Sequence, residues 1–120
     1  MRAANPKPGR RTRKTTDFNL AYRLLTFADS VHPSRQAKFL AGISALGFAQ
    51  AAFSETTSIK EKDKSCELAL AGAAMVPAAR ADIVAGQEEF AEPASQAMGF
   101  VAQLETYMKQ QMPLFCTKVP

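Results

Sequence analysis

Two cysteines are the residues of this chain best suited to covalent chemistry. Cys66 and Cys116 are the only cysteines in the sequence, and no C-x-x-C or C-x-x-C-H motif accompanies them. Redox exchange and haem attachment are therefore not indicated, and an even pair favours one structural disulfide. Disulfides persist in oxidising compartments rather than in the cytosol. The pair predicts a disulfide-closed domain in an exported protein, with two buried free thiols in a cytosolic protein as the alternative.

Other groups that could catalyse a reaction or bind a metal are scarce. The single histidine, His32, lies outside residues 52–120, so that part of the chain has no histidine for a nucleophile pair or a zinc site. No glycine-rich phosphate loop is present. Glu88, Glu89 and Glu92 form an acidic cluster, which on a helix is most often a solvated face. The sequence predicts no catalytic residue, no cofactor, no metal site and no enzymatic activity.

Basic residues are concentrated near the N-terminus. Residues 1–38 carry nine of the 15 Lys and Arg side chains but only two of the 11 acidic ones. A run within them consists of Arg10, Arg11, Arg13 and Lys14. Such a run provides salt-dependent, sequence-independent affinity for phosphate, which makes nucleic-acid binding an alternative function. The rest of the chain is mildly acidic and shows no interleaving of basic and aromatic residues.

An apolar segment follows the basic leader. Residues 39–48 are uncharged and too short to span a bilayer of about 30 Å. Arg35 and Lys38 precede the segment, and Ala49-Gln50-Ala51 follows it. This order is typical of a secretory signal peptide. The predicted cleavage-site residues are Ala49, Ala51 and Ala52. A buried Ala-rich helix and an uncleaved signal anchor are the alternatives.

These patterns divide the chain into three parts. Residues 1–38 form a basic leader, predicted to be disordered because its N-terminal stretch cannot bury enough apolar area. Residues 39–51 form the apolar region and cleavage site of the signal peptide, and residues 52–120 form the mature domain. An Arg-rich, acid-poor leader would also suit an organellar transit peptide.

The pattern after residue 51 is helical. Ser58 and Glu61 have the spacing of a capping box, which predicts a helix over residues 58–76. Pro77 is expected to interrupt it, because proline lacks the N–H of a helix interior. A second helix is predicted over residues 78–91.

A third helix is predicted over residues 93–113, with its apolar residues recurring at spacings of three and four. These residues are Ala97, Phe100, Val101, Leu104, Tyr107 and Met108. An antiparallel return of this helix would bring Cys116 to Cys66. The predicted fold is all-α, a small three-helix bundle or helical hairpin closed by one disulfide.

The favoured function is a non-enzymatic, exported interaction protein, periplasmic or secreted, whose partner is another protein of the cell envelope. Envelope, secretion or conjugation assemblies and immunity-type binding are candidate roles. The residues of the predicted partner surface are Glu88, Glu89, Phe90, Glu92, Phe100 and Tyr107. No stable transmembrane segment is expected in the mature form. The alternatives are a cytoplasmic or organellar nucleic-acid-binding protein, and a membrane-active small protein or toxin in which residues 39–53 insert.

Overall fold

The computed structural model of this chain describes the backbone of residues 7–116 and the side chains from residue 15 onward. Four helices make up the described part, namely α1 (Lys7–Val31), α2 (Arg35–Thr56), α3 (Lys62–Ala85) and α4 (Ala91–Phe115). No strand occurs between residues 7 and 116. The predicted all-α fold is confirmed, but with four long helices in place of three short ones.

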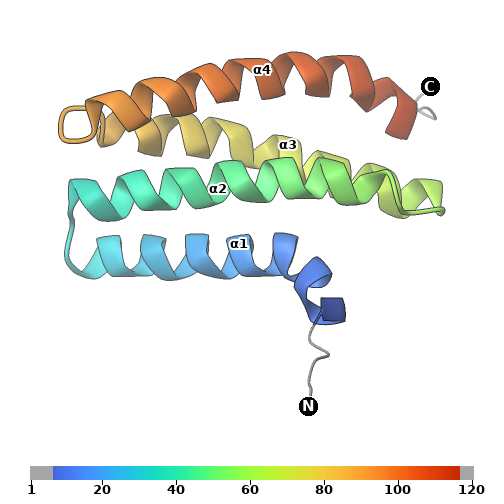
Figure 1. The fold of residues 1–120 in the computed structure, drawn as a ribbon, viewed down its shortest axis with the longest axis horizontal. Helices are drawn as coiled ribbons and strands as arrows, with labels where there is room; N and C mark the ends of the chain where they lie inside the picture. Colours follow the sequence, from blue (N-terminus) through green and yellow to red (C-terminus); the bar gives the residue numbers. More distant parts are fainter. Residues whose placement is uncertain (1–6, 117–120) are drawn as a thin grey trace.

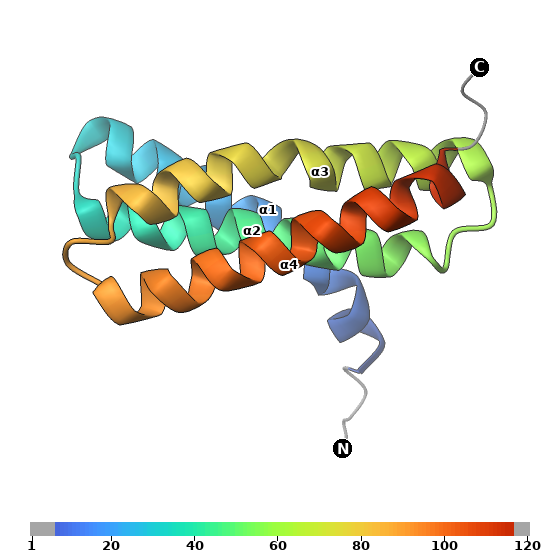
Figure 2. The same cartoon turned by 90° about the horizontal axis from the view of Figure 1, so that it is seen from above.

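Consecutive helices run antiparallel, with α2 at the centre (Figure 1). α2 packs against α1 and α3, and α4 crosses α3 and part of α2, as seen from above in Figure 2. Among the other helices, α1 contacts α2 alone. The connections α1–α2 and α3–α4 therefore lie at one end of the bundle, and the α2–α3 turn lies at the other.

Small side chains allow α2 and α3 to approach closely. A Cβ atom added at Gly72 would lie 2.9 Å from the Cβ of Ala52, and one added at Gly42 would lie 2.9 Å from the backbone N of Ile83. The core around this contact includes Phe39, Leu46, Phe53, Val76, Ile83, Val101, Leu104 and Met108. Much of the apolar area of such a core comes from its few large side chains, because each alanine contributes little.

The apolar segment assigned to a signal peptide is the middle of α2. Ser34 caps this helix, since its hydroxyl accepts a hydrogen bond of 2.9 Å from the N–H of Ala37. Ala49, Ala51 and Ala52 are all buried inside the bundle. The peptide bond after Ala51 is therefore shielded in the folded protein, so cleavage there would have to precede folding. That cleavage stays a prediction.

The predicted disorder of residues 1–38 differs from the structure, in which Lys7–Val31 forms α1; residues 1–6 lie outside the described part. The ring of Phe18 lies over Gly47, with its Cε1 only 2.5 Å from where a Cβ would stand. Tyr22 also packs against the core. The helix is thus ordered by packing on α2, which the composition of its first residues does not reveal.

The helix boundaries after residue 51 also differ from those predicted. Pro77 lies inside α3, which runs unbroken from Lys62 to Ala85. A proline in a helix interior costs about 3 kcal/mol, and the burial of Val76 and Ala79 on either side of it offsets this cost. Pro113 likewise lies inside α4.

The predicted capping box at residues 58–61 is wrong. α2 continues to Thr56, and the N–H of Ser58 donates to the carbonyl of Glu55 in the following turn. Glu61 is the N-cap of α3, with no side-chain capping bond. Residues 57–61 reverse the direction of the chain, so they are not available for a helix.

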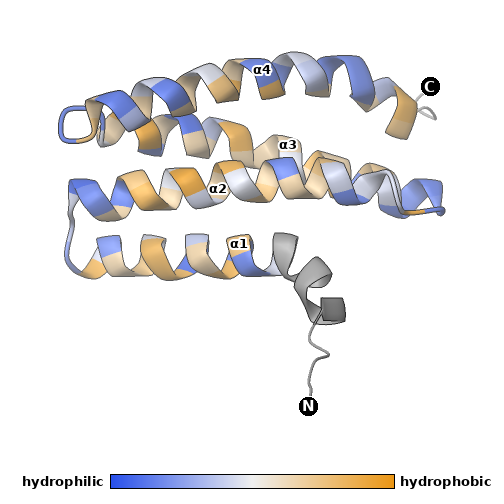
Figure 3. Cartoon of the chain, viewed as in Figure 1, coloured by the Kyte–Doolittle hydropathy of each residue, from blue (hydrophilic) through white to orange (hydrophobic). Residues whose placement is uncertain are grey.

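Hydrophobic residues are distributed along all four helices (Figure 3). Among the described residues, α3 is the one helix long and apolar enough to cross a membrane by length and composition. Of its apolar stretch 28% is buried, and Ala69, Val76 and Ile83 of this helix belong to the core of the bundle.

Candidate functional site

A groove of about 420 Å³ lies between α2 and α4. It is lined by Gln50, Phe53 and Ser54 of α2, by Thr57 directly after that helix, and by Phe100, Gln103, Leu104 and Tyr107 of α4. The two helices make only limited contact because α4 packs mainly on α3. The groove is therefore a direct result of the way α4 crosses the bundle.

Aromatic and aliphatic side chains form the floor of the groove. Phe53 is buried, and its ring meets Tyr107 edge to face at 6.1 Å and Phe115 at 5.9 Å. Leu104 is also buried, whereas Tyr107 is 42% exposed. Such edge-to-face pairs stabilise the fold by about 1 kcal/mol beyond the contribution of their buried area. The rings of the floor are therefore held in place before any partner binds.

The rim of the groove is polar but carries no ionised group. Gln50, Ser54, Thr57 and Gln103 are exposed, and the Thr57 hydroxyl donates to the carbonyl of Ser54 at 2.8 Å. The two amides offer both donors and acceptors. The groove thus suits an uncharged apolar or aromatic group that carries hydrogen-bonding atoms at its edge.

The residues of the predicted partner surface fall in two places. Phe100 and Tyr107 line the groove. Glu88 and Glu89 lie in the turn between α3 and α4, and Glu92 in the first turn of α4. They are exposed, and together they form an acidic corner at the opposite end of α4 from Tyr107.

Phe90, which precedes α4, has a structural role. Its ring stacks on Phe39 with centroids 4.9 Å apart, and it is half-buried against the core. Beside it, Glu88 pairs with Arg35 at 3.3 Å. Phe90 therefore attaches the α3–α4 turn to the start of α2 and offers little of its ring to a partner.

The α2 side of the groove was not predicted from the sequence. Gln50 was assigned to the cleavage site, and Phe53, Ser54 and Thr57 to the start of the mature domain, ahead of its first predicted helix. Their spacing of three, four and seven residues places them on one side of a helix. That periodicity is the signal that could have identified them, had the segment been treated as a folded helix.

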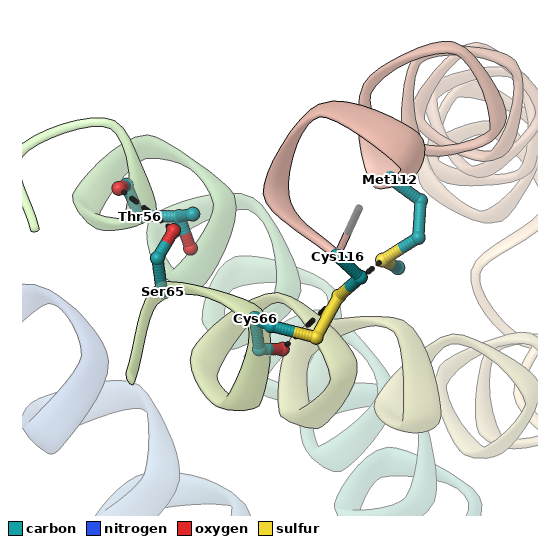
Figure 4. The surroundings of a disulfide bond; sticks show 5 residues. All are labelled: Thr56, Ser65, Cys66, Met112 and Cys116. Carbon is teal, nitrogen blue, oxygen red and sulfur yellow. Dashed lines mark hydrogen bonds between the residues drawn. A yellow bond between two sulfur atoms is a disulfide. The ribbon is translucent and has the colours of Figure 1, made fainter. Parts of the chain in front are cut away.

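The Cys66–Cys116 disulfide is confirmed, with the two Cα atoms 4.9 Å apart. It joins the beginning of α3 to the residue that follows α4, next to the α2–α3 turn (Figure 4). Cys116 Sγ also contacts Met112 Sδ at 3.8 Å. Because Phe115 is the adjacent residue, the disulfide holds the end of α4 against the floor of the groove.

A second cleft of about 500 Å³ lies on the other side of α4, against α3. Glu105 and Lys109 line it, and Glu105 is hydrogen-bonded to Arg80. Its apolar lining comes from aliphatic side chains, without an aromatic residue; these are Ala73, Val76, Pro77, Ala102 and Met108. The α2–α4 groove is therefore the better candidate for binding an apolar group.

Carboxyl groups with a shifted pKa lie away from the groove, near the α1–α2 connection. Hydrogen bonds from Lys38 and from the backbone N–H of Ser34 lower the pKa of Asp29. Burial raises the pKa of Asp82, with a smaller opposing effect of Lys38. This arrangement resembles a structural ion-pair cluster, since Asp29 is paired with Lys38.

The side chains of Arg10, Arg11, Arg13 and Lys14, which were predicted to contact phosphate, lie outside the described part. Within residues 15–116, no group of three or more His, Cys, Asp or Glu side chains is placed to hold a metal ion. The absence of a cofactor stays a prediction.

Comparisons with known proteins add no assignment. No protein-family model matches the sequence, and neither a curated protein nor a solved structure matches the chain. The function must therefore be argued from the residues of the groove and from the bundle that forms it.

Proposed function

We propose that this chain is a non-enzymatic interaction protein, periplasmic or secreted, that binds another protein of the cell envelope through the α2–α4 groove. The observation that carries this proposal is an aromatic floor formed by Phe53 and Tyr107 beneath an uncharged polar rim. Aromatic side chains in well-packed pockets are typical of the residues that contribute most to protein interfaces.

The compartment is inferred from the disulfide. A Cys66–Cys116 bond is stable where the surroundings are oxidising, which favours the periplasm or the exterior over the cytosol. The sequence also supports export, because residues 39–48 are apolar and follow basic residues, as in a signal peptide. Both features point to the cell envelope.

The proposed active form retains residues 39–51. Cleavage after Ala51 would remove α1 and about three quarters of α2, including Phe39 and Leu46 of the core. The groove would also lose Gln50. We therefore infer that the segment first directs export and then stays in the protein as part of α2.

The lining of the groove defines the chemistry of the partner. An apolar or aromatic side chain would enter between Phe100 and Tyr107, while amide or hydroxyl groups beside it would bond to Gln50 and Gln103. A charged group would lose its hydration there without gaining a counterion. The partner segment is therefore expected to be uncharged at the point of contact.

Photo-crosslinking in the native host tests this proposal. A photoreactive phenylalanine analogue in place of Phe100 should give one discrete protein adduct in the envelope fraction, and the same analogue in place of the exposed Val84 on α3 should not. Equal adduct patterns from both positions, or none from Phe100, would contradict the assignment of the groove.

A pair of isosteric variants measures the contribution of the groove to affinity. Gln103→Glu places a charge on the rim, whereas Gln96→Glu places the same charge on α4 outside the groove. Gln103→Glu should weaken binding of the crosslinked partner by about tenfold or more, and Gln96→Glu should leave it unchanged. Similar affinities for both variants would rule out binding in the groove.

A further inference from the structure

α1 has two apolar faces, of which the bundle uses one. Phe18, Tyr22 and Leu25 lie on the side that packs against α2. A second set of apolar side chains is exposed to solvent. These residues are Leu20 (57% exposed), Leu24 (59%), Phe27 (67%) and Val31 (67%), and they form what we call the outer stripe.

The outer stripe is a continuous line along the helix. Its residues follow one another at spacings of four, three and four, which places them on one side of α1, opposite the side that contacts α2. α1 lies at one edge of the bundle in Figure 1, and α2 is the one helix that it contacts. No other described helix covers the stripe.

Basic residues precede the outer stripe in the sequence. Lys7, Arg10, Arg11, Arg13 and Lys14 precede it within the bounds of α1, according to the sequence. Among the other described residues of α1, Asp17 and Arg23 are exposed, and Asp29 is paired with Lys38. The helix therefore combines Leu and Phe side chains with an excess of basic residues.

We propose that the outer stripe docks on the surface of an anionic lipid membrane, with α1 lying in the plane of the interface. Leu24 and Phe27 would enter the boundary between headgroups and acyl chains, and the basic run would lie near the lipid phosphates. Helices that combine an apolar face with Lys and Arg bind membranes in this way. This attachment is independent of the groove and would hold the protein at the membrane peripherally.

A second copy of the chain is a less suitable occupant. Even at about 200 Å² for each fully exposed side chain, a value for aromatic residues that exceeds those of Leu and Val, the outer stripe offers at most about 500 Å² per copy. A stable interface buries about 800 Å² per partner. A parallel pairing would also bring two basic runs together. A membrane needs no shape complementarity and would be attracted by the same charges.

Vesicle co-sedimentation of the full-length, oxidised protein tests the proposal. The protein should bind vesicles of equimolar phosphatidylglycerol and phosphatidylcholine, and binding should weaken as salt is raised. Leu24→Asp should weaken vesicle binding by about tenfold or more. Val84→Asp, an equally drastic change at an exposed position of α3, should change binding by less than about twofold.

Each contrary result overturns the proposal. Absence of binding to the anionic vesicles, or equal binding by Leu24→Asp and the unchanged protein, would remove the membrane as the occupant. A dimer in sedimentation velocity that Leu24→Asp dissociates, without vesicle binding, would assign the stripe to a second copy. Gln103→Glu should bind vesicles like the unchanged protein, which keeps this test separate from that of the groove.

Discussion

Replacing Phe39 by alanine tests whether the apolar segment before residue 51 belongs to the folded protein. Phe39 is 7% exposed in α2, and its ring stacks on Phe90 at 4.9 Å. Its neighbour Leu40 is 41% exposed, so Leu40→Ala is a matched control one residue away. If the segment did not pack into the bundle of the full-length protein, neither change would affect its stability by much.

The expected loss follows from the burial of the ring. Phe→Ala in a core costs about 3–5 kcal/mol, which includes the cavity left by the ring. At about 2.1 cal/mol/K per residue, a 120-residue chain has an unfolding entropy near 0.25 kcal/mol/K. The loss for Phe39→Ala therefore corresponds to a fall in Tm of about 12–20 °C. Leu40→Ala should change stability by about 0.5 kcal/mol, or about 2 °C.

Thermal unfolding of the full-length, oxidised protein, followed by circular dichroism, measures both variants against the parent. A fall in Tm of less than about 4 °C for Phe39→Ala, equivalent to about 1 kcal/mol, would refute the placement of this ring in the core. The double variant with Phe90→Ala adds a check, because the two rings are in contact. Their coupling energy should be about 0.5–1.5 kcal/mol.

Three further predictions follow from individual contacts. Cys66→Ser removes a cross-link with a sequence separation of 50 and should lower the free energy of unfolding, measured in urea, by about 4 kcal/mol. Under reducing conditions the parent lacks the cross-link as well, so the variant and the parent should then be equally stable. Gly72→Ala should destabilise by about 1–3 kcal/mol, because its Cβ would stand 2.9 Å from that of Ala52; Gly99→Ala, with nothing within 4 Å, should stabilise by about 1 kcal/mol. Burial raises the pKa of the Asp82 carboxyl, so the folded protein binds the carboxyl proton more tightly than the unfolded chain does. The free energy of unfolding therefore falls as the pH rises from the ordinary carboxyl pKa through the raised one. Asp82→Asn should therefore be more stable than the parent at neutral pH and show less of this decline in denaturation curves recorded across pH.

The all-α fold was predictable because helical periodicity is a local property of the sequence, and the disulfide was predictable from the number of cysteines. The stripe on residues 93–113 has the helical period, and four of its residues, Ala97, Val101, Leu104 and Met108, are buried in α4 as expected. Phe100 and Tyr107 lie at the edges of the same stripe, so they are only partly covered and face the groove. Two cysteines allow one intramolecular pairing, which the structure confirms.

The helix boundaries were not predictable from the same local signals, because tertiary packing outweighs them. Pro77 and the capping-box pattern at residues 58–61 are each worth a few kcal/mol or less. The burial of Val76, Ala79 and Ile83 along one unbroken helix outweighs both. α1 was missed for another reason. Its inner and outer apolar faces are opposite each other, so they cancel in any search for a single apolar side.

The assignment of residues 39–51 shows why one pattern can predict two different structures. A signal peptidase site needs small side chains at Ala49 and Ala51, because its pockets admit no larger ones. The contact of α2 with α3 needs small side chains at Ala49 and Ala52 for a different reason, since Gly72 lies directly against them. Composition alone therefore cannot distinguish a cleaved signal from a buried helix.

Burial in the full chain favours the second case, a retained helix. A segment that is removed contributes nothing to the mature core, whereas Phe39, Leu46 and Ala49 belong to the same cluster as Ile83 and Val101. The remaining residues 52–120 would have to bury the apolar sides of α3 and α4 without most of α2, and chains of that size seldom have area to spare. We therefore expect the disulfide-bonded protein from its native host to have an intact mass that includes residues 39–51. A mass equal to that of residues 52–120 would show that α3 and α4 fold in another arrangement.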